Sequence, residues 1–153
     1  MSFLTRILPS FLVSWLLTFT LASLFHSHYV VNQLVNVGVV VGLSDRVSLM
    51  LDDWLGLLPT YGAIIALALA CAFLVTALLY KRHKQQAMQL FMFTGIAAFA
   101  VLLLAIESIM HINIIAGARG WGFYAQLFAG AIGGYVFSLL LQLNSGKRDG
   151  HAL

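Results

Sequence analysis

Glu107 and His111 are the two side chains of this sequence whose types and spacing could do chemistry together. They lie four residues apart, so on a helix they share one face and can touch. A carboxylate beside an imidazole can pass on a proton or bind a cation, which makes the pair a candidate proton relay or ion site. The alternative is a structural role, in which Glu107 accepts hydrogen bonds from Arg119 or a histidine and fixes the following loop. The sequence leaves both interpretations open.

Three histidines could in principle bind a metal or a haem group. His26 and His28 lie two residues apart and point ~200° from each other on a helix, so both reach one ion only where the helix has unwound. With His111 they could offer three imidazoles to zinc or copper, or one facing pair to a haem iron. The sequence has no second facing pair. Since histidines are also tolerated as polar helix ends, we expect no metal and no cofactor.

Other catalytic signatures are missing from the sequence. It contains no G-x-S-x-G, H-E-x-x-H or C-x-x-C motif and no phosphate-binding glycine loop. The one cysteine, Cys71, can form no internal disulfide. Asp52 and Asp53 are adjacent and diverge by ~100° on a helix, so we expect them on a solvated face rather than in a paired-carboxylate site. These observations favour a non-enzymatic protein and leave an enzyme open.

The composition of the chain sets the elements that must position these residues. Of the 153 residues, 61% are hydrophobic and 8% are charged, and the mean hydropathy is +0.97. A soluble domain of this size leaves roughly 30% of its unfolded-chain surface in water, so lipid must be the solvent for much of this chain. The net charge of +3 comes from Lys and Arg beside apolar segments. That pattern is typical of membrane topology signals rather than of nucleic-acid binding.

Four apolar runs meet or approach the ~20 residues that a helix needs to cross the hydrocarbon layer. They cover about 7–25, 61–80, 88–110 and 122–143. We therefore predict one all-α domain over residues 1–153, a four-transmembrane-helix bundle that runs up-down-up-down. The first run could instead be a signal peptide, but no clear A-x-A cleavage site accompanies it.

The positive charges favour a cytoplasmic location for both termini. Six of the eight Lys and Arg residues then lie on the inner side, and two, Arg46 and Arg119, lie on the outer side. The strongest signal is the basic turn 81–84 between two clear spans. In this orientation, polar groups gather at the outer side. The predicted outer-side cluster consists of Glu107, His111, Arg119, His26, His28 and Asn113.

Residues 44–58 have the pattern of a short amphipathic helix. Apolar residues at 47, 50, 51, 54, 55 and 58 make one stripe, Ser44 and Asp45 are typical of a helix start, and Pro59 is expected to end the segment. We predict that this helix lies in the outer interface, with Trp54, like Trp121, as an aromatic anchor. A helix packed on another part of the protein would show the same stripe, so that alternative stays open.

The last apolar run offers a face for close helix packing. Gly130 and Gly134 form a G-x-x-x-G pair, and Ala129 with Gly133 adds a second pair of small residues at the same spacing. Small residues let helix backbones approach in lipid, where the hydrophobic effect contributes little attraction between helices. We expect this face to pack inside the bundle. A contact between copies of the chain is the alternative.

Several short stretches bear on the location of the protein. They are 114–120 (IIAGARG) with 126–134 (QLFAGAIGG), Ser27-His28, Gln33-Leu34 and 57–61 (LLPTY). In these stretches the chain resembles small four-helix inner-membrane proteins of proteobacteria. The resemblance implies a bacterial inner membrane and attaches no activity to any residue.

Three classes of function remain open. The leading one is a non-enzymatic accessory or assembly subunit that acts by helix packing in the lipid bilayer, within a larger membrane complex or a homo-oligomer. The rival is a small oligomeric transporter or channel in which Glu107 and His111 handle protons or a cation, because four helices alone enclose little room for a pathway. The third, an enzyme acting on lipid or quinone at the outer leaflet, would need Glu107, His111 and Arg119 to converge.

Overall fold

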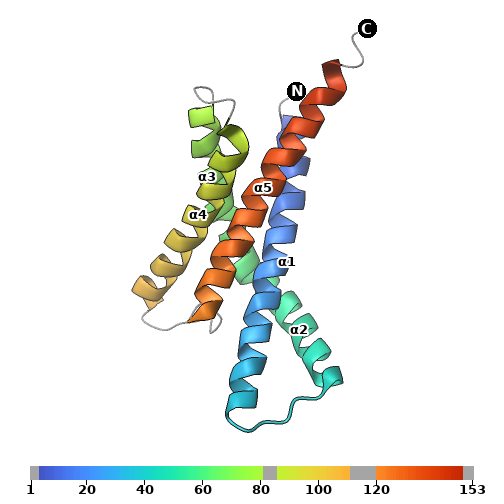
Figure 1. Cartoon of the computed structure of the whole chain (residues 1–153), viewed down its shortest axis with the longest axis vertical. Helices are drawn as coiled ribbons and strands as arrows, with labels where there is room; N and C mark the ends of the chain where they lie inside the picture. The colour runs from blue at the N-terminus through green and yellow to red at the C-terminus, as the bar shows by residue number, and fades with distance from the viewer. Residues whose placement is uncertain (1–3, 81–85, 111–119, 150–153) are drawn as a thin grey trace.

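The computed structural model of the protein describes residues 4–80, 86–110 and 120–149. Within these ranges every regular element is helical, and four helical segments are long and apolar enough to cross a membrane (Figure 1). The prediction of an all-helical chain with four helices of membrane-crossing length is confirmed for this part of the chain.

Helix α1 covers Leu4–Asn36 and extends well beyond the first predicted span. It continues because neither glycine nor proline occurs between Pro9 and Gly38. At ~1.5 Å per residue it is about 50 Å long, compared with ~30 Å for the hydrocarbon layer. The helix ends at Gly38, whose φ of +87° lies in the left-handed region, and the amide of Val39 donates back to the carbonyl of Leu34 at 3.0 Å. This is the Schellman arrangement that glycine makes possible.

Helices α2 (Leu43–Leu57) and α3 (Ala63–Tyr80) are joined by a π-helical turn, η1 (Leu58–Gly62), so the chain stays helical through Pro59. The α-helix α2 ends at Leu57, close to the predicted end at 58, but helical structure does not stop at Pro59 as expected. Proline lacks an N–H and its ring crowds the carbonyl one turn earlier, and the wider π turn accommodates both effects. As a result, α2 packs on α1 whereas α3 packs mainly on α4.

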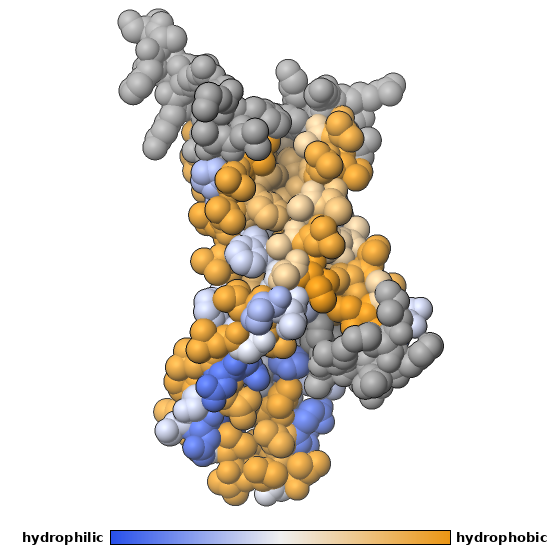
Figure 2. All heavy atoms as spheres, turned by 180° about the vertical axis from the view of Figure 1, so that it is seen from behind, coloured by the Kyte–Doolittle hydropathy of each residue, from blue (hydrophilic) through white to orange (hydrophobic). Residues whose placement is uncertain are grey.

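Helices α4 (Ala87–Met110) and α5 (Trp121–Asp149) complete the bundle. Helix α4 packs between α3 and α5, and α5 packs between α4 and α1. The first turns of α1 and the last turns of α5 lie at the same end of the molecule (Figure 1). Figure 2 shows hydrophilic residues gathered toward the opposite end, over α2 and the second half of α1, while hydrophobic residues cover most of the remaining described surface.

Helices α4 and α5 approach closely at glycines. A Cβ atom added to Gly95 would collide with the carbonyl oxygen of Gly130, and one added to Gly134 would collide with the carbonyl oxygen of Phe91. Backbone atoms of one helix therefore occupy the space that side chains would take on the other. The structure places the G-x-x-x-G pair against a helix of the same chain.

Helix α1 uses small side chains to reach α5 from the other side. Thr18 fills the position where a Cβ of Gly133 would lie, and the Ser14 hydroxyl donates to the Gly133 carbonyl oxygen at 2.6 Å. Ala129, the fourth predicted packing residue, is fully buried. Small residues on α5 thus serve two helix contacts at once.

Phenylalanines fill the space between α1, α3, α4 and α5. The rings of Phe73 and Phe137 stack at 4.4 Å, and Phe91 meets them edge-on at 5.6 and 5.2 Å. Phe11 of α1 adds a further edge contact to Phe73 at 6.4 Å. This aromatic core joins helices from both halves of the chain.

Candidate functional site

Most of the buried polar side chains that the structure describes belong to α1. The buried polar side chains of α1 are Ser10, Ser14, Thr18, Ser23, His26 and Ser27. Thr76, Gln126 and Ser138 are the ones on other helices. Polar groups in a lipid environment are costly unless they are hydrogen-bonded. The partners of these groups therefore show which helices are joined by hydrogen bonds and which buried polar groups have no hydrogen bond.

Gln126 of α5 links α1 to the junction of α2 and α3. Its Oε1 accepts from the Tyr61 hydroxyl of η1 at 3.1 Å, and its Nε2 donates to the Ala22 carbonyl oxygen of α1 at 2.9 Å. Gln126 and Tyr61 are both buried. The indole Nε1 of Trp15 adds a bond to the Gly62 carbonyl oxygen at 2.8 Å. One bond from α1 and one to α5 thus hold the π-helical turn, and a third joins α5 to α1 beside it.

Helix α2 is held on α1 by polar side chains. The Ser27 hydroxyl donates to Asp53 Oδ2 at 2.7 Å, and the Trp54 indole Nε1 donates to Thr20 Oγ1 at 3.2 Å. Hydrogen bonds to an ionised carboxylate are shorter and stronger than those between neutral groups. His26 is buried beside this contact and interacts electrostatically with Asp53. Ser27 and Asp53 therefore meet where α2 packs on α1, and His26 interacts electrostatically with the same carboxylate.

Ser23 lies between these contacts, three residues after Thr20 and four before Ser27. Its hydroxyl is buried and makes no hydrogen bond to any residue that the structure describes. Its carbonyl oxygen lies 3.1 Å from the Ser27 hydroxyl. A buried hydroxyl with unused hydrogen-bonding capacity is a typical position for an ordered internal water. We name Ser23, His26, Ser27 and Asp53 the α1–α2 polar cluster.

The α1–α2 polar cluster does not have the order of a nucleophilic triad. In such a triad the hydroxyl donates to an imidazole, and the carboxylate holds the other ring nitrogen. Here Ser27 donates to Asp53 directly. A carboxylate that accepts from a hydroxyl and interacts electrostatically with an imidazole can instead share or hold a proton. In the ranges that the structure describes, no group of three His, Cys, Asp or Glu side chains could hold a metal ion.

The two adjacent aspartates of α2 have different environments. Asp52 is exposed, in line with the expected solvated face, whereas Asp53 is half-buried and bound by Ser27. The expectation is therefore wrong for Asp53. The side chains diverge as adjacent helical residues must, and the turn of α2 happens to aim the second one at α1.

The outer-side cluster predicted from the sequence is described only in part. Glu107 lies in the last turn of α4 and is exposed. His111, Asn113 and Arg119 lie outside the described residues. The pairing of Glu107 with His111 stays a prediction.

The two histidines of α1 point in different directions, because the helix is continuous through both. His26 is buried beside Asp53 of α2. His28 is exposed, and its ring lies 6.0 Å from that of Trp121, nearly edge-on. Each histidine therefore has its own neighbour on a different helix.

The predicted anchors Trp54 and Trp121 both pack on α1. Trp54 lies 5.6 Å from the ring of Phe19 and bonds to Thr20, so it holds α2 in place. Trp121, at the start of α5, lies 5.6 Å from the ring of Tyr29. Contact with a membrane interface stays a prediction for both residues.

Sequence reasoning missed the residues that form the buried contacts. It assigned no role to Gln126, Tyr61, Ser23 or Ser27 and placed Asp53 in solvent. One usable signal was present, because hydroxyl residues recur along α1 at 10, 14, 18, 23 and 27 within a mainly apolar run. That spacing marks the sides of α1 that face neighbouring helices, although it does not identify the partner residues.

Alanine at Asp53 should weaken the docking of α2, whereas alanine at Asp52 should not. We expect Asp53→Ala to lower the free energy of unfolding by about 1 kcal/mol, since it removes a hydrogen bond between helices. Asp52→Ala should change it by less than about 0.5 kcal/mol, as is usual for an exposed position. Unfolding in mixed detergent micelles measures both variants. Equal effects of the two substitutions would contradict the Ser27–Asp53 contact.

No family model, curated protein or solved structure matches this chain. The function therefore has to be argued from the contacts and surfaces described above.

Proposed function

We propose that this chain is a multi-pass protein of the bacterial inner membrane that serves as an accessory or assembly subunit and acts through helix packing. Four helices long and apolar enough to span a membrane support the location. The side chains that point outward from these helices are mostly large and apolar, as contact with lipid requires, among them Leu67, Leu74, Val101 and Leu104. A soluble protein rarely exposes such an extensive apolar surface.

The observation that carries the proposal is that buried polar side chains form hydrogen bonds between helices. Ser14 binds α5, Gln126 binds both α1 and η1, and Thr76 of α3 donates to Thr94 of α4 at 2.7 Å. A conduction pathway needs polar groups that face water, whereas these groups face one another. A bundle tied in this way suits a protein that works by offering its outer surface to partners.

The distribution of positive charge supports cytoplasmic termini and an up-down-up-down path. Six of the eight Lys and Arg residues fall on the inner side in this orientation. The first turns of α1 and the last turns of α5 lie at one end of the bundle, which agrees with an even number of crossings (Figure 1). Reporter fusions at residue 84 and in the segment 37–42 should report the cytoplasm and the periplasm, respectively. The reverse result would contradict this orientation.

Helix α2 fits an amphipathic helix at the outer membrane interface. Its residues Leu43, Val47, Leu51 and Leu55 are spaced by four, and all are exposed. Its other apolar side, which includes Trp54, packs on α1. An exposed apolar stripe beside aspartates is the surface expected where lipid chains meet head groups.

Mild detergent purification with mass spectrometry of bound proteins, lipids and cofactors tests the proposal. An accessory subunit should co-purify in a fixed ratio with a larger membrane complex. Recovery of the chain free of other proteins but with a small-molecule cofactor in a fixed ratio would contradict it. The measurement also separates the subunit interpretation from an enzyme that acts at the outer leaflet.

The exposure of Glu107 favours a second candidate, a transporter or channel made of several copies. A carboxylate on the outer surface of α4 could line a pathway only at a contact between copies. If the protein is an accessory subunit, Glu107→Gln should change the free energy of unfolding by less than about 0.5 kcal/mol. Glu107→Gln should also leave the amount of co-purified partner protein unchanged. Lipid vesicles that contain the wild-type protein should show no proton or cation flux. A wild-type flux that Glu107→Gln abolishes and Ser108→Ala preserves would establish the transporter.

A further inference from the structure

Ser23 of α1 faces α2 with a hydroxyl that bonds to no residue the structure describes. On a helix, the nearest neighbours of a side chain lie three and four positions before and after it. All four of these neighbours of Ser23 interact with α2. The first two contact Trp54 and the last two interact with Asp53, in the order Phe19, Thr20, His26 and Ser27. Since Ser23 is only 1% exposed, its hydroxyl lies within the contact between α1 and α2.

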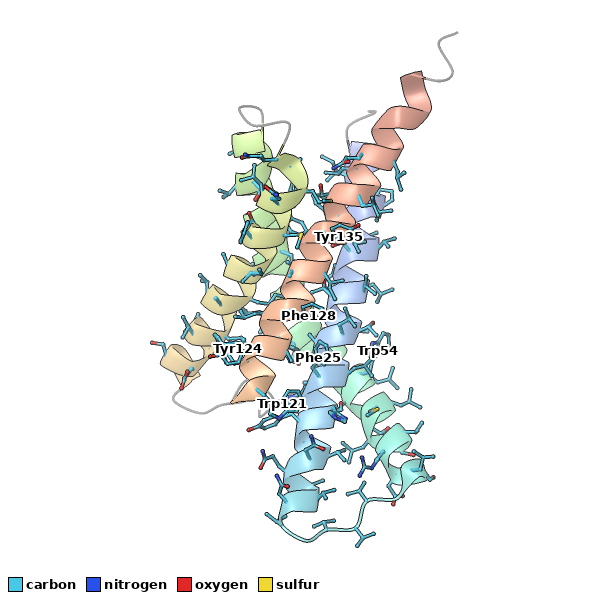
Figure 3. All side chains as sticks on the ribbon, viewed as in Figure 1. Phe25, Trp54, Trp121, Tyr124, Phe128 and Tyr135 are labelled. Atoms are coloured by element: carbon cyan, nitrogen blue, oxygen red, sulfur yellow. The ribbon has the colours of Figure 1, made fainter. Side chains whose placement is uncertain are left out.

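Two hydroxyl oxygens and one carboxylate come together at this contact. The Ser27 hydroxyl gives its one hydrogen to Asp53 Oδ2 at 2.7 Å, so the lone pairs of its oxygen remain available. The Ser23 hydroxyl adds a second neutral oxygen one helical turn earlier. Figure 3 shows Trp54, the residue after Asp53, where α2 approaches α1. Hard cations bind oxygen ligands of this kind, whereas zinc and copper prefer imidazole and thiolate ligands.

The charge of Asp53 favours a cation over a water molecule alone. A water could satisfy the Ser23 hydroxyl, but a half-buried carboxylate is stabilised further when a positive charge lies beside it. Arg46, on the same helix as Asp53, directs its Nε to the Val41 carbonyl oxygen at 3.3 Å. An ordinary histidine has a pKa of ~6.5 and is mostly neutral at about pH 8. At that pH an imidazole such as that of His26 does not balance the carboxylate charge.

The number of charges and the position of the contact indicate which cation fits. Asp53 supplies one negative charge, and the neighbouring Asp52 is exposed and diverges from it. A single carboxylate balances a monovalent ion, whereas calcium and magnesium carry two charges. Asp53 is half-buried, and Figure 2 shows hydrophilic residues over α2 and the second half of α1. An ion in the solvent can therefore reach the carboxylate without crossing the apolar part of the bundle.

We propose that the α1–α2 polar cluster binds a monovalent metal cation, for which sodium is the probe, through the hydroxyl oxygens of Ser23 and Ser27 and the carboxylate of Asp53. Water beside the half-buried carboxylate supplies the remaining ligands. The ion joins two helices, so its binding stabilises the docking of α2 on α1. This structural role is independent of whether the chain belongs to a larger membrane complex.

Thermal unfolding of the full chain in detergent at about pH 8 tests this site, with sodium chloride compared with choline chloride at equal ionic strength. Choline is a monovalent cation whose methyl groups prevent direct contact between its charge and oxygen ligands. We expect sodium to raise the Tm of the wild type by about 3–6 °C once its concentration is about 10-fold above the Kd. Ser23→Ala and Asp53→Asn should abolish this difference. Ser48→Ala, at an exposed position of α2, is the matched control and should preserve it.

The Ser23→Ala variant also separates a lost ligand from a lost contact. In choline it should be as stable as the wild type or more stable, because it removes a buried hydroxyl that has no partner in the described part of the chain. In sodium it should be less stable, because it removes a ligand of the ion. A wild-type Tm that is equal in both salts, or a sodium effect that Ser23→Ala retains, would overturn the proposal. A Ser23→Ala protein that is less stable than the wild type by the same amount in both salts would also overturn it, since the hydroxyl would then serve an ordered water or helix packing.

Discussion

The substitution Gly130→Ala is expected to lower the free energy of unfolding by about 1–3 kcal/mol. The added Cβ would meet the carbonyl oxygen of Gly95 and the ring of Phe99. The carbonyl belongs to the backbone of α4 and cannot rotate away, so α4 and α5 must move apart. The separation would also loosen the contact of Gly134 with Phe91, one turn along the same two helices. Unfolding in mixed detergent micelles measures the loss.

A change from glycine to alanine at Gly56 should have the opposite effect on the free energy of unfolding. Gly56 lies within α2, and nothing lies within 4 Å of the position that its Cβ would take. Alanine there removes the entropic disadvantage of glycine in a helix, so Gly56→Ala should raise the free energy of unfolding by about 0.5–1 kcal/mol. A Gly130→Ala protein that is as stable as the wild type would contradict the close approach of α4 and α5.

The helices could be predicted from the sequence because their apolar runs are long enough to cross a membrane. Their ends could not be predicted in the same way. Hydropathy locates the apolar part of α1, but the helix continues through polar residues to Asn36, where only a glycine stops it. Pro59 predicts a stop because proline ends helices in water. In a helix that leads into a membrane span, keeping the backbone hydrogen-bonded favours a bend instead.

The contacts of the candidate site were harder to predict than the helices. Ser27 and Asp53 are 26 residues apart, and Tyr61 and Gln126 are 65 apart. Such pairs depend on the rotation of each helix about its own axis, which the sequence of an almost uniformly apolar helix does not determine. The glycines of α5 were easier to predict, because small residues spaced by four show where the helix permits close approach.

Replacing Gln126 by methionine should produce the second large loss of stability. Methionine has a similar length and volume, so the change removes polar atoms without creating a large cavity. The Tyr61 hydroxyl would be left buried without its acceptor, and the Ala22 carbonyl oxygen would lose the bond from α5. An unsatisfied buried group of this kind costs about 1–3 kcal/mol. Gln89→Met, at an exposed position of α4, is the control and should change stability by less than about 0.5 kcal/mol.

A double substitution separates the hydrogen bond from the packing of the two side chains. Tyr61→Phe alone should destabilise the protein, because the Gln126 oxygen loses its donor. Combined with Gln126→Met, it should cost less than the sum of the single changes, since neither polar group is then left without a partner. We expect a coupling energy of about 0.5–1.5 kcal/mol. Strictly additive losses would show that Tyr61 and Gln126 stabilise the bundle independently. That result would contradict the hydrogen bond between α5 and the π-helical turn.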